Sequence, residues 1–232
     1  MFLFQKHFDD LLSLLFPNLC CGCGASLYAG ESQLCSSCLY HLPYTDHHLH
    51  QENRVARQFW GRIPCHAAMS MLFFRKEGNV QQIIHHLKYS NRPELGVKLG
   101  QLLGERLLLS PYYQNIDLLI PVPLHKKRER KRGYNQSAGI ADGIAKVLQL
   151  PMSSAHLLRK VPTDSQTKKG RSLRFENMSK AFEVRNEEAL QGKHILLVDD
   201  VLTTGATLEA CGLELLKYGV DKVSFATLAF VG

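Results

Sequence analysis

The sequence contains no apolar run long enough to cross a membrane, no convincing export signal and no P-loop motif. Its start, MFLFQKHFDDLLSLLF, is apolar along one helical face but is interrupted by Asp9 and Asp10. A spanning helix needs about 20 predominantly apolar residues, and an export signal needs an uninterrupted apolar centre. The lack of GxxxxGK[S/T] argues against a P-loop NTPase. These absences predict a cytoplasmic protein with no membrane span.

The composition also rules out a disordered chain and a collagen-like repeat. Apolar residues make up 45% of the 232 residues and charged residues 21%, which is ordinary for a globular protein. A chain of this length forms one large domain or two small ones.

Positive charge is concentrated in two short segments. The chain has 28 basic and 21 acidic residues, for a net charge of +7. Residues 126–132 (KKRERKR) and 159–174 (RKVPTDSQTKKGRSLR) each contain six basic residues and one acidic residue. The rest of the chain is therefore net negative, and the local positive field suggests an anionic ligand. Two solvated basic loops would have the same composition.

Four of the seven cysteines have the spacing of a zinc site. Cys20 and Cys23 form one CxxC pair, and Cys35 and Cys38 form a second pair eleven residues later. Each pair is expected to form a tight turn that directs two thiolates toward one ion, and four thiolates leave no open position for catalysis. We therefore predict structural zinc. The alternatives are two disulfides in an exported protein, or Cys21 as a ligand in place of Cys20.

The segments on either side of the cysteines complete the predicted N-terminal module. We interpret residues 1–16 as an amphipathic helix that packs on the zinc site, with docking to a partner as the alternative. The histidines that follow the cysteines are interpreted as a solvated linker, namely His41, His47, His48 and His50. The predicted module therefore covers residues 1–60, and a second domain covers residues 61–232.

From residue 61 onward, apolar strands alternate with amphipathic helices, as in an α/β fold with a parallel sheet flanked by helices. Strands are predicted over 65–74, 117–123, 194–200 and 222–231, and helices over 79–90, 93–109, 135–150 and 206–219. In such sheets, ligands bind beyond the carboxyl ends of the strands.

The segment after strand 194–200 is the strongest candidate ligand site. Asp199 and Asp200 end the strand, and TTGAT at 203–207 leads into a helix. Successive backbone N–H groups, threonine hydroxyls and the helix dipole suit a phosphate, and Gly205 lets the backbone approach it. The carboxylates can accept hydrogen bonds from sugar hydroxyls. The pattern predicts a ribose 5-phosphate site, and a strand that ends in helix-capping aspartates is the alternative.

The stretch ILLVDDVLTTGAT at 195–207 resembles the phosphoribosyl-pyrophosphate (PRPP) motif of type I phosphoribosyltransferases. The resemblance implies that Asp199 and Asp200 bind the ribose hydroxyls. It assigns the 5-phosphate to Thr203, Thr204, Gly205, Ala206 and Thr207. It also places a pyrophosphate loop in IPVPLHKKRERKRGYNQS, after the first buried core strand. Thr203 stands where hypoxanthine-guanine enzymes carry an aspartate base, which argues against purine salvage of that type.

Four features occur together in one order: the cysteine module, RGYNQS at 132–137, the PRPP motif, and between the last two a polar series of Arg159, Thr163, Gln166, Arg174 and Asn177. Over nearly the whole chain, this combination resembles the ComF family of bacterial competence proteins. The resemblance implies a zinc-binding N-terminus and a type I phosphoribosyltransferase-like domain. It also implies a role in handling transforming DNA, with a helicase of the uptake machinery as a candidate partner.

Residues in or next to the two basic segments are predicted to bind pyrophosphate or nucleic acid: Arg128, Arg132, Gly133, Tyr134 and Asn135 at the first, and Lys168, Lys169, Arg171 and Arg174 in the second. The latter belong to a long polar segment, 161–180, that we interpret as a lid. Tyr134 is expected either to stack on a base or to pack. Lys88 and Tyr89 are either secondary cleft residues or a solvated helix end.

The expected chemistry leaves two functions open. Mg²⁺ would bridge the pyrophosphate and the ribose hydroxyls, and cationic side chains would stabilise the departing pyrophosphate. No residue identifies a catalytic group or the acceptor. The first function is transfer of a phosphoribosyl group to an unknown acceptor. The second is non-catalytic binding of PRPP, a nucleotide or single-stranded DNA.

Overall fold

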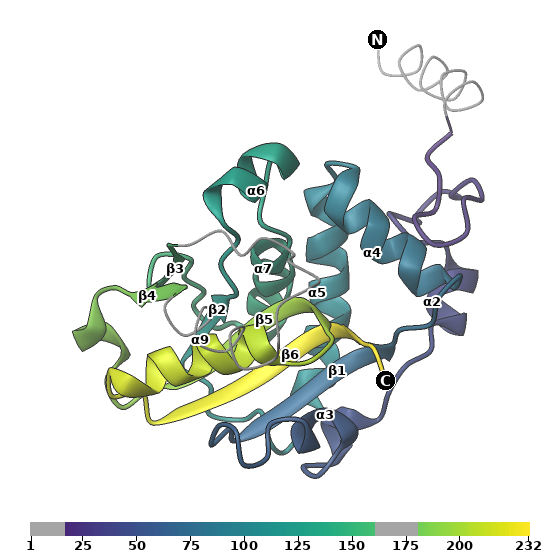
Figure 1. The fold of residues 1–232 in the computed structure, drawn as a ribbon. Coiled ribbons are helices and arrows are strands. Elements are labelled where there is room, and N and C mark those ends of the chain that lie inside the picture. Colours follow the sequence, from purple (N-terminus) through teal and green to yellow (C-terminus); the bar gives the residue numbers. More distant parts are fainter. Residues whose placement is uncertain (1–16, 161–180) are drawn as a thin grey trace.

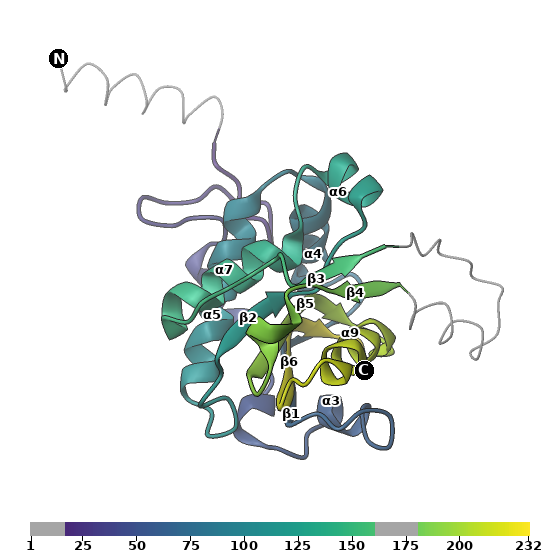
Figure 2. The ribbon, with the colours of Figure 1, turned by 90° about the vertical axis from the view of Figure 1, so that its left-hand side faces the viewer.

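The computed structural model describes residues 17–160 and 181–232, and its centre is a four-stranded parallel sheet with helices on both faces (Figures 1 and 2). The strand order is β1-β6-β5-β2, and the strands are β1 (Ala67–Phe73), β2 (Leu118–Pro121), β5 (His194–Leu202) and β6 (Lys222–Phe230). All three strand pairings are parallel. The parallel α/β sheet predicted from the sequence is confirmed.

Helices cover the two faces of the sheet over separate apolar clusters. One face packs against α4 (Asn79–Tyr89), α5 (Pro93–Leu108) and α7 (Gln136–Leu148). The other packs against α3 (Arg54–Arg57) and α9 (Ala206–Lys217). No helix in either described part of the chain is both long and apolar enough to cross a bilayer.

Glycines bring α5 and α7 into close contact. A Cβ atom added at Gly100 of α5 would lie 2.1 Å from the carbonyl oxygen of Ile140, and one added at Gly143 of α7 would lie 2.2 Å from the carbonyl oxygen of Val97. The two helix backbones therefore meet directly, with no side chain between them.

Smaller elements surround the carboxyl end of the sheet. The basic segment is a helix, α6 (Lys126–Arg132), that begins at His125 and ends at Gly133, which has a φ of 85°. Every residue of α6 is exposed or only partly buried, so the sequence has no apolar periodicity that would predict this helix. A two-stranded antiparallel sheet lies nearby, formed by β3 (Leu157–Arg159) and β4 (Phe182–Val184).

The interpretation of the histidine segment as a solvated linker is wrong for two of its four members. His47 and His48 are only 4% and 5% exposed, in the short helix η1 (His47–Leu49). They are buried because the preceding backbone pairs with β1: the Thr45 N–H donates to the Met71 carbonyl, and the Phe73 N–H donates to the Pro43 carbonyl, each at 2.8 Å. Two further short helices are α2 (Ser36–His41) and η2 (Glu187–Leu190).

Two predicted features lie outside the described residues. These are the N-terminal helix over 1–16 and the lid over 161–180, with its candidate ligands Lys168, Lys169, Arg171 and Arg174.

Candidate functional site

The turn between β5 and α9 has the form of an anion-binding loop. Thr203 and Thr204 are exposed, and Gly205 caps α9 with a φ of 74°. The first N–H groups of a helix have no partner within the helix, so this turn directs donors and the positive end of the helix dipole to one place. Gly205 is also required by packing, because an added Cβ would lie 2.9 Å from Cε1 of Phe59. The sequence pattern predicted only ligand approach as the reason for this glycine.

The two aspartates near the carboxyl end of β5 are held by two different helices. Asp199 Oδ1 accepts hydrogen bonds from Ser137 Oγ and from the Asp200 N–H, each at 2.9 Å. Asp200 Oδ2 lies 2.9 Å from Lys88 Nζ, and the two side chains are 13% and 23% exposed. Asp199 is therefore fixed by the first turn of α7 and Asp200 by the last turn of α4.

The environment of Asp199 favours its protonated form. Burial raises the pKa of Asp199, and the neighbouring charge of Asp200 raises it further. Hydrogen bonds from the Asp200 N–H and Ser137, and the charge of Lys88, oppose this rise, and the resulting pKa is about 7. The carboxyl group therefore exchanges a proton near neutral pH.

The structure shows what the residues around the aspartates contact. Lys88 is not a solvated helix end, because it forms an ion pair with Asp200. The hydroxyl of Tyr134 donates to the Leu87 carbonyl, and burial raises the pKa of this partly buried tyrosine. Tyr134 therefore packs in the described structure. Tyr89 is exposed beside Arg132, whose guanidinium carbon lies 5.4 Å from the ring centroid.

A second candidate site is formed by four cysteines. The Sγ atoms of Cys20, Cys23, Cys35 and Cys38 all lie within 4.8 Å of one another. The Cys23–Cys35 sulfur separation is 3.7 Å, close to the value of about 3.8 Å that follows from tetrahedral Zn–S bonds of about 2.3 Å. All seven cysteines are described, and none forms a disulfide. The four thiols thus fit one tetrahedral metal ion such as zinc.

The local backbone prepares Cys20, rather than Cys21, to be a ligand. The N–H groups of Gly22 and Cys35 lie 3.4 and 3.3 Å from Cys20 Sγ. Burial alone raises the pKa of Cys20, but backbone hydrogen bonds outweigh it and lower the pKa to about 6, which favours the thiolate that binds metal. Cys21 Sγ instead accepts a hydrogen bond from Arg92 Nη1 at 3.3 Å.

Comparison with known proteins gives the family. Residues 135–232 match the phosphoribosyl transferase domain family. DNA utilization protein YhgH of Salmonella typhimurium is 34% identical over 144 residues, which are 61% of this chain and 63% of that protein. The protein of the same name in Shigella flexneri is 30% identical over 225 residues, or 90% of this chain and 96% of that protein. Competence protein F of Haemophilus influenzae is 27% identical over 225 residues, covering 92% and 97% of the two chains. The chain belongs to the ComF family. The match to the Salmonella protein spans less than two thirds of that relative's length.

The ComF-family domain has a type I phosphoribosyltransferase-like fold, as the sequence resemblance implied. Within it, the RGYNQS segment is joined to the aspartates. Asn135 caps α7 by accepting from the Ser137 N–H at 3.1 Å, and its Nδ2 donates to the Val122 carbonyl at 3.1 Å. Ser137 then bonds Asp199. Sequence analysis missed Ser137 as a site residue, although it ends a segment that was singled out.

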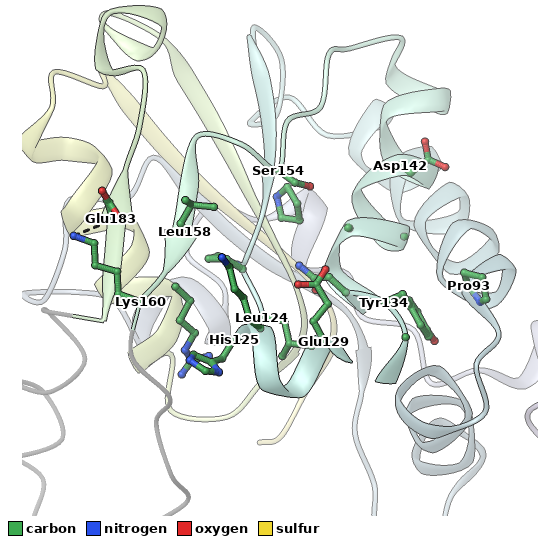
Figure 3. A pocket seen from close by; sticks show the side chains of 18 of the residues that line it. Pro93, Leu124, His125, Glu129, Tyr134, Asp142, Ser154, Leu158, Lys160 and Glu183 are labelled. Atoms are coloured by element: carbon green, nitrogen blue, oxygen red, sulfur yellow. Dashed lines mark ion pairs between the residues drawn. The ribbon is translucent and has the colours of Figure 1, made fainter. Parts of the chain in front are cut away.

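A pocket of about 770 Å³ lies beside this site, between α6, α7 and the β3–β4 sheet (Figure 3). It brings together three predicted residues, Gly133, Tyr134 and Asn135, but none of residues 199–207. Its wall on the β3–β4 side includes Lys160 and Glu183, whose Nζ and Oε2 atoms lie 3.3 Å apart. Arg128 and Arg132 do not line the pocket.

We expect the ComF-family chain to bind one zinc ion at the four-cysteine cluster. Cys38→Ser should abolish stoichiometric zinc and lower the melting temperature, because structural zinc contributes folding free energy. Cys21→Ser should retain the metal, since its sulfur contacts Arg92 instead. Metal content by atomic absorption and thermal unfolding test both variants. Loss of zinc from Cys21→Ser with retention by Cys38→Ser would contradict the assignment.

Proposed function

We propose that this ComF-family protein binds PRPP or a related ribose 5-phosphate ligand, with Mg²⁺, at the carboxyl end of β5. Two partly exposed carboxyl groups beside an open helix-capping loop carry the proposal. Asp199 and Asp200 would bind the ribose hydroxyls, and Thr203 through Thr207 would bind the 5-phosphate. The carboxylate oxygens suit a hard cation, which would screen the charge of a bound pyrophosphate.

The positively charged residues of the site would contact or stabilise the anionic parts of the ligand. Lys88 is already 2.9 Å from Asp200, so it would meet the part of the ligand next to the ribose. The basic side chains of α6 would stabilise charge that develops on a departing pyrophosphate. The pocket beside α7 offers space for an acceptor, because Asn135 lines it and lies two residues from Ser137, the partner of Asp199.

The names of the relatives suggest a biological role. They refer to DNA utilization and to competence, and we extend this role to the present chain, as a cytoplasmic protein that handles incoming DNA. The exposed basic residues of α6 would then contact phosphates of single-stranded DNA. The four-cysteine module would hold structural zinc and provide a contact for a DNA-uptake helicase.

Calorimetric titration with PRPP, with and without Mg²⁺, tests the proposed ligand. We expect Mg²⁺-dependent binding, and a parallel assay for pyrophosphate release over a panel of bases and amines distinguishes catalysis from binding. Single-stranded DNA provides the comparison, because multiple phosphate contacts lose affinity by orders of magnitude between low and physiological salt. Salt-sensitive DNA binding without any PRPP binding would favour the non-catalytic DNA-handling function and reject the sugar-phosphate site.

A further inference from the structure

Residues 53–62, which lie between the four cysteines and β1, support the 203–205 turn. Asn53 fixes this segment to the sheet, because its Nδ2 donates to the Ala68 carbonyl at 2.8 Å. Phe59 is fully buried, and its ring centroid lies 4.6 Å from that of Phe225 in β6. The same ring fills the space beside Gly205 that a side chain would otherwise occupy. The turn therefore rests on residues far from it in the sequence.

Arg62 in this segment contacts both the turn and the helix that follows. Its Nη1 donates to the Thr204 carbonyl at 3.0 Å and to the Gln58 carbonyl at 2.9 Å. Its Nη2 forms an ion pair with Glu209 Oε2. The Glu209 side chain is only 5% exposed, whereas that of Arg62 is 35% exposed. One guanidinium group thus joins the supporting segment to the turn and to the first turn of α9.

The contact between Arg62 and the Thr204 carbonyl also fixes the direction of the N–H group in the same planar peptide. The described backbone contains no cis peptide, and in a trans peptide the carbonyl and the N–H point in opposite directions. Because Arg62 holds the Thr204 carbonyl, the Gly205 N–H of the same peptide points away from Arg62. Arg62 also neutralises Glu209, whose charge in the first turn of α9 would otherwise weaken anion binding at the helix start.

We infer that Arg62 is a positioning residue for the 5-phosphate. It fixes the Thr204–Gly205 peptide so that the N–H faces the ligand side, and it does so without contacting the phosphate. This inference rests on the proposed function, since it assigns a role within the same sugar-phosphate site. It also extends that site to residues that precede the sheet in sequence.

Calorimetry with two ligands, ribose 5-phosphate and Mg²⁺–pyrophosphate, tests this role. Arg62→Met should weaken ribose 5-phosphate at least about tenfold, the scale of one lost charge-assisted hydrogen bond. It should leave pyrophosphate affinity within about twofold, a selectivity that general destabilisation would not produce. Arg57→Gln is the matched control, because Arg57 is an exposed arginine of the same segment that lies 5.8 Å from the Trp60 ring centroid.

A double variant separates positioning from charge neutralisation and serves as the test protein if Arg62→Met does not fold. Arg62→Met with Glu209→Gln removes the buried unpaired carboxylate, so folding should recover while ribose 5-phosphate binding stays weak. Recovery of wild-type affinity in the double variant would overturn the positioning role, as would equal affinities in Arg62→Met and wild type. If wild-type protein fails to bind ribose 5-phosphate at all, the proposed function itself is rejected.

Discussion

Asp199→Asn should weaken Mg²⁺–PRPP binding about a hundredfold at pH 8 and have almost no effect at pH 5.5. At pH 8 the wild-type side chain is a carboxylate, because its pKa is about 7, and charged hydrogen bonds are worth about 1.5–3 kcal/mol each. At pH 5.5 the wild-type group is protonated and resembles asparagine in charge. Calorimetric titrations of both proteins across this pH range provide the measurement.

The raised pKa of Asp199 also predicts that the stability of the fold depends on pH. The pKa of Asp199 in the fold is about 7, against an ordinary value of 3.8, so the folded state holds the proton more tightly than the unfolded state. The stability that comes from the proton bound to Asp199 is present below about pH 4 and is lost as pH rises through 7. Asp199→Asn should therefore raise the melting temperature at pH 8 but not at pH 4.

A matched control separates the effect of protonating Asp199 from the effect of protonating the ligand. Asp221→Asn changes an exposed aspartate whose only ion pair among the described residues is with Lys222, at 3.6 Å. The affinity of this variant for Mg²⁺–PRPP should equal that of wild type at every pH, because protonation of the ligand affects both proteins equally. A deficit in Asp199→Asn that stays constant from pH 5.5 to 8 would show that proton exchange at Asp199 does not govern binding.

The sequence was informative wherever one short stretch contains both the signal and its cause. Strand β5, the turn after it and helix α9 follow directly from an apolar run, two acids and a glycine-containing turn. The four-cysteine cluster follows from two CxxC pairs, because each pair converges on its own. Helix α6 did not follow, because all seven of its residues are charged and its start and end are set by His125 and Gly133.

Contacts between distant segments were beyond sequence reasoning. Lys88 ends a helix and carries no local sign that it meets Asp200. Arg62 lies 142 residues before Thr204 and falls next to the predicted boundary at residue 60, where no ligand role was expected. Such pairs arise only when the sheet brings its strand ends together. The sequence therefore predicted the turn after β5 but not the residues that hold it in place.

The glycines between α5 and α7 are another feature that only the packed structure explains, and they lead to the largest expected loss of stability. Gly143→Ala should lower the free energy of unfolding by about 3 kcal/mol, because inserted atoms in a packed core force backbone shifts. The added Cβ would lie 2.2 Å from the Val97 carbonyl oxygen and 2.8 Å from the Gln101 nitrogen. Alanine's helix propensity offsets only about 1 kcal/mol of this cost. Urea unfolding measures the difference.

Gly139→Ala in the same helix is the matched control, and it should behave in the opposite way. Its added Cβ would meet nothing closer than the Pro93 carbonyl oxygen at 3.4 Å, so the helix propensity of alanine can dominate and stability should stay level or rise by up to about 1 kcal/mol. Because α7 also positions Ser137 against Asp199, displacement of α7 in Gly143→Ala should weaken Mg²⁺–PRPP binding as well. Equal unfolding midpoints for the two variants would mean that the helices can separate without cost, which the direct backbone contact at Gly143 does not allow.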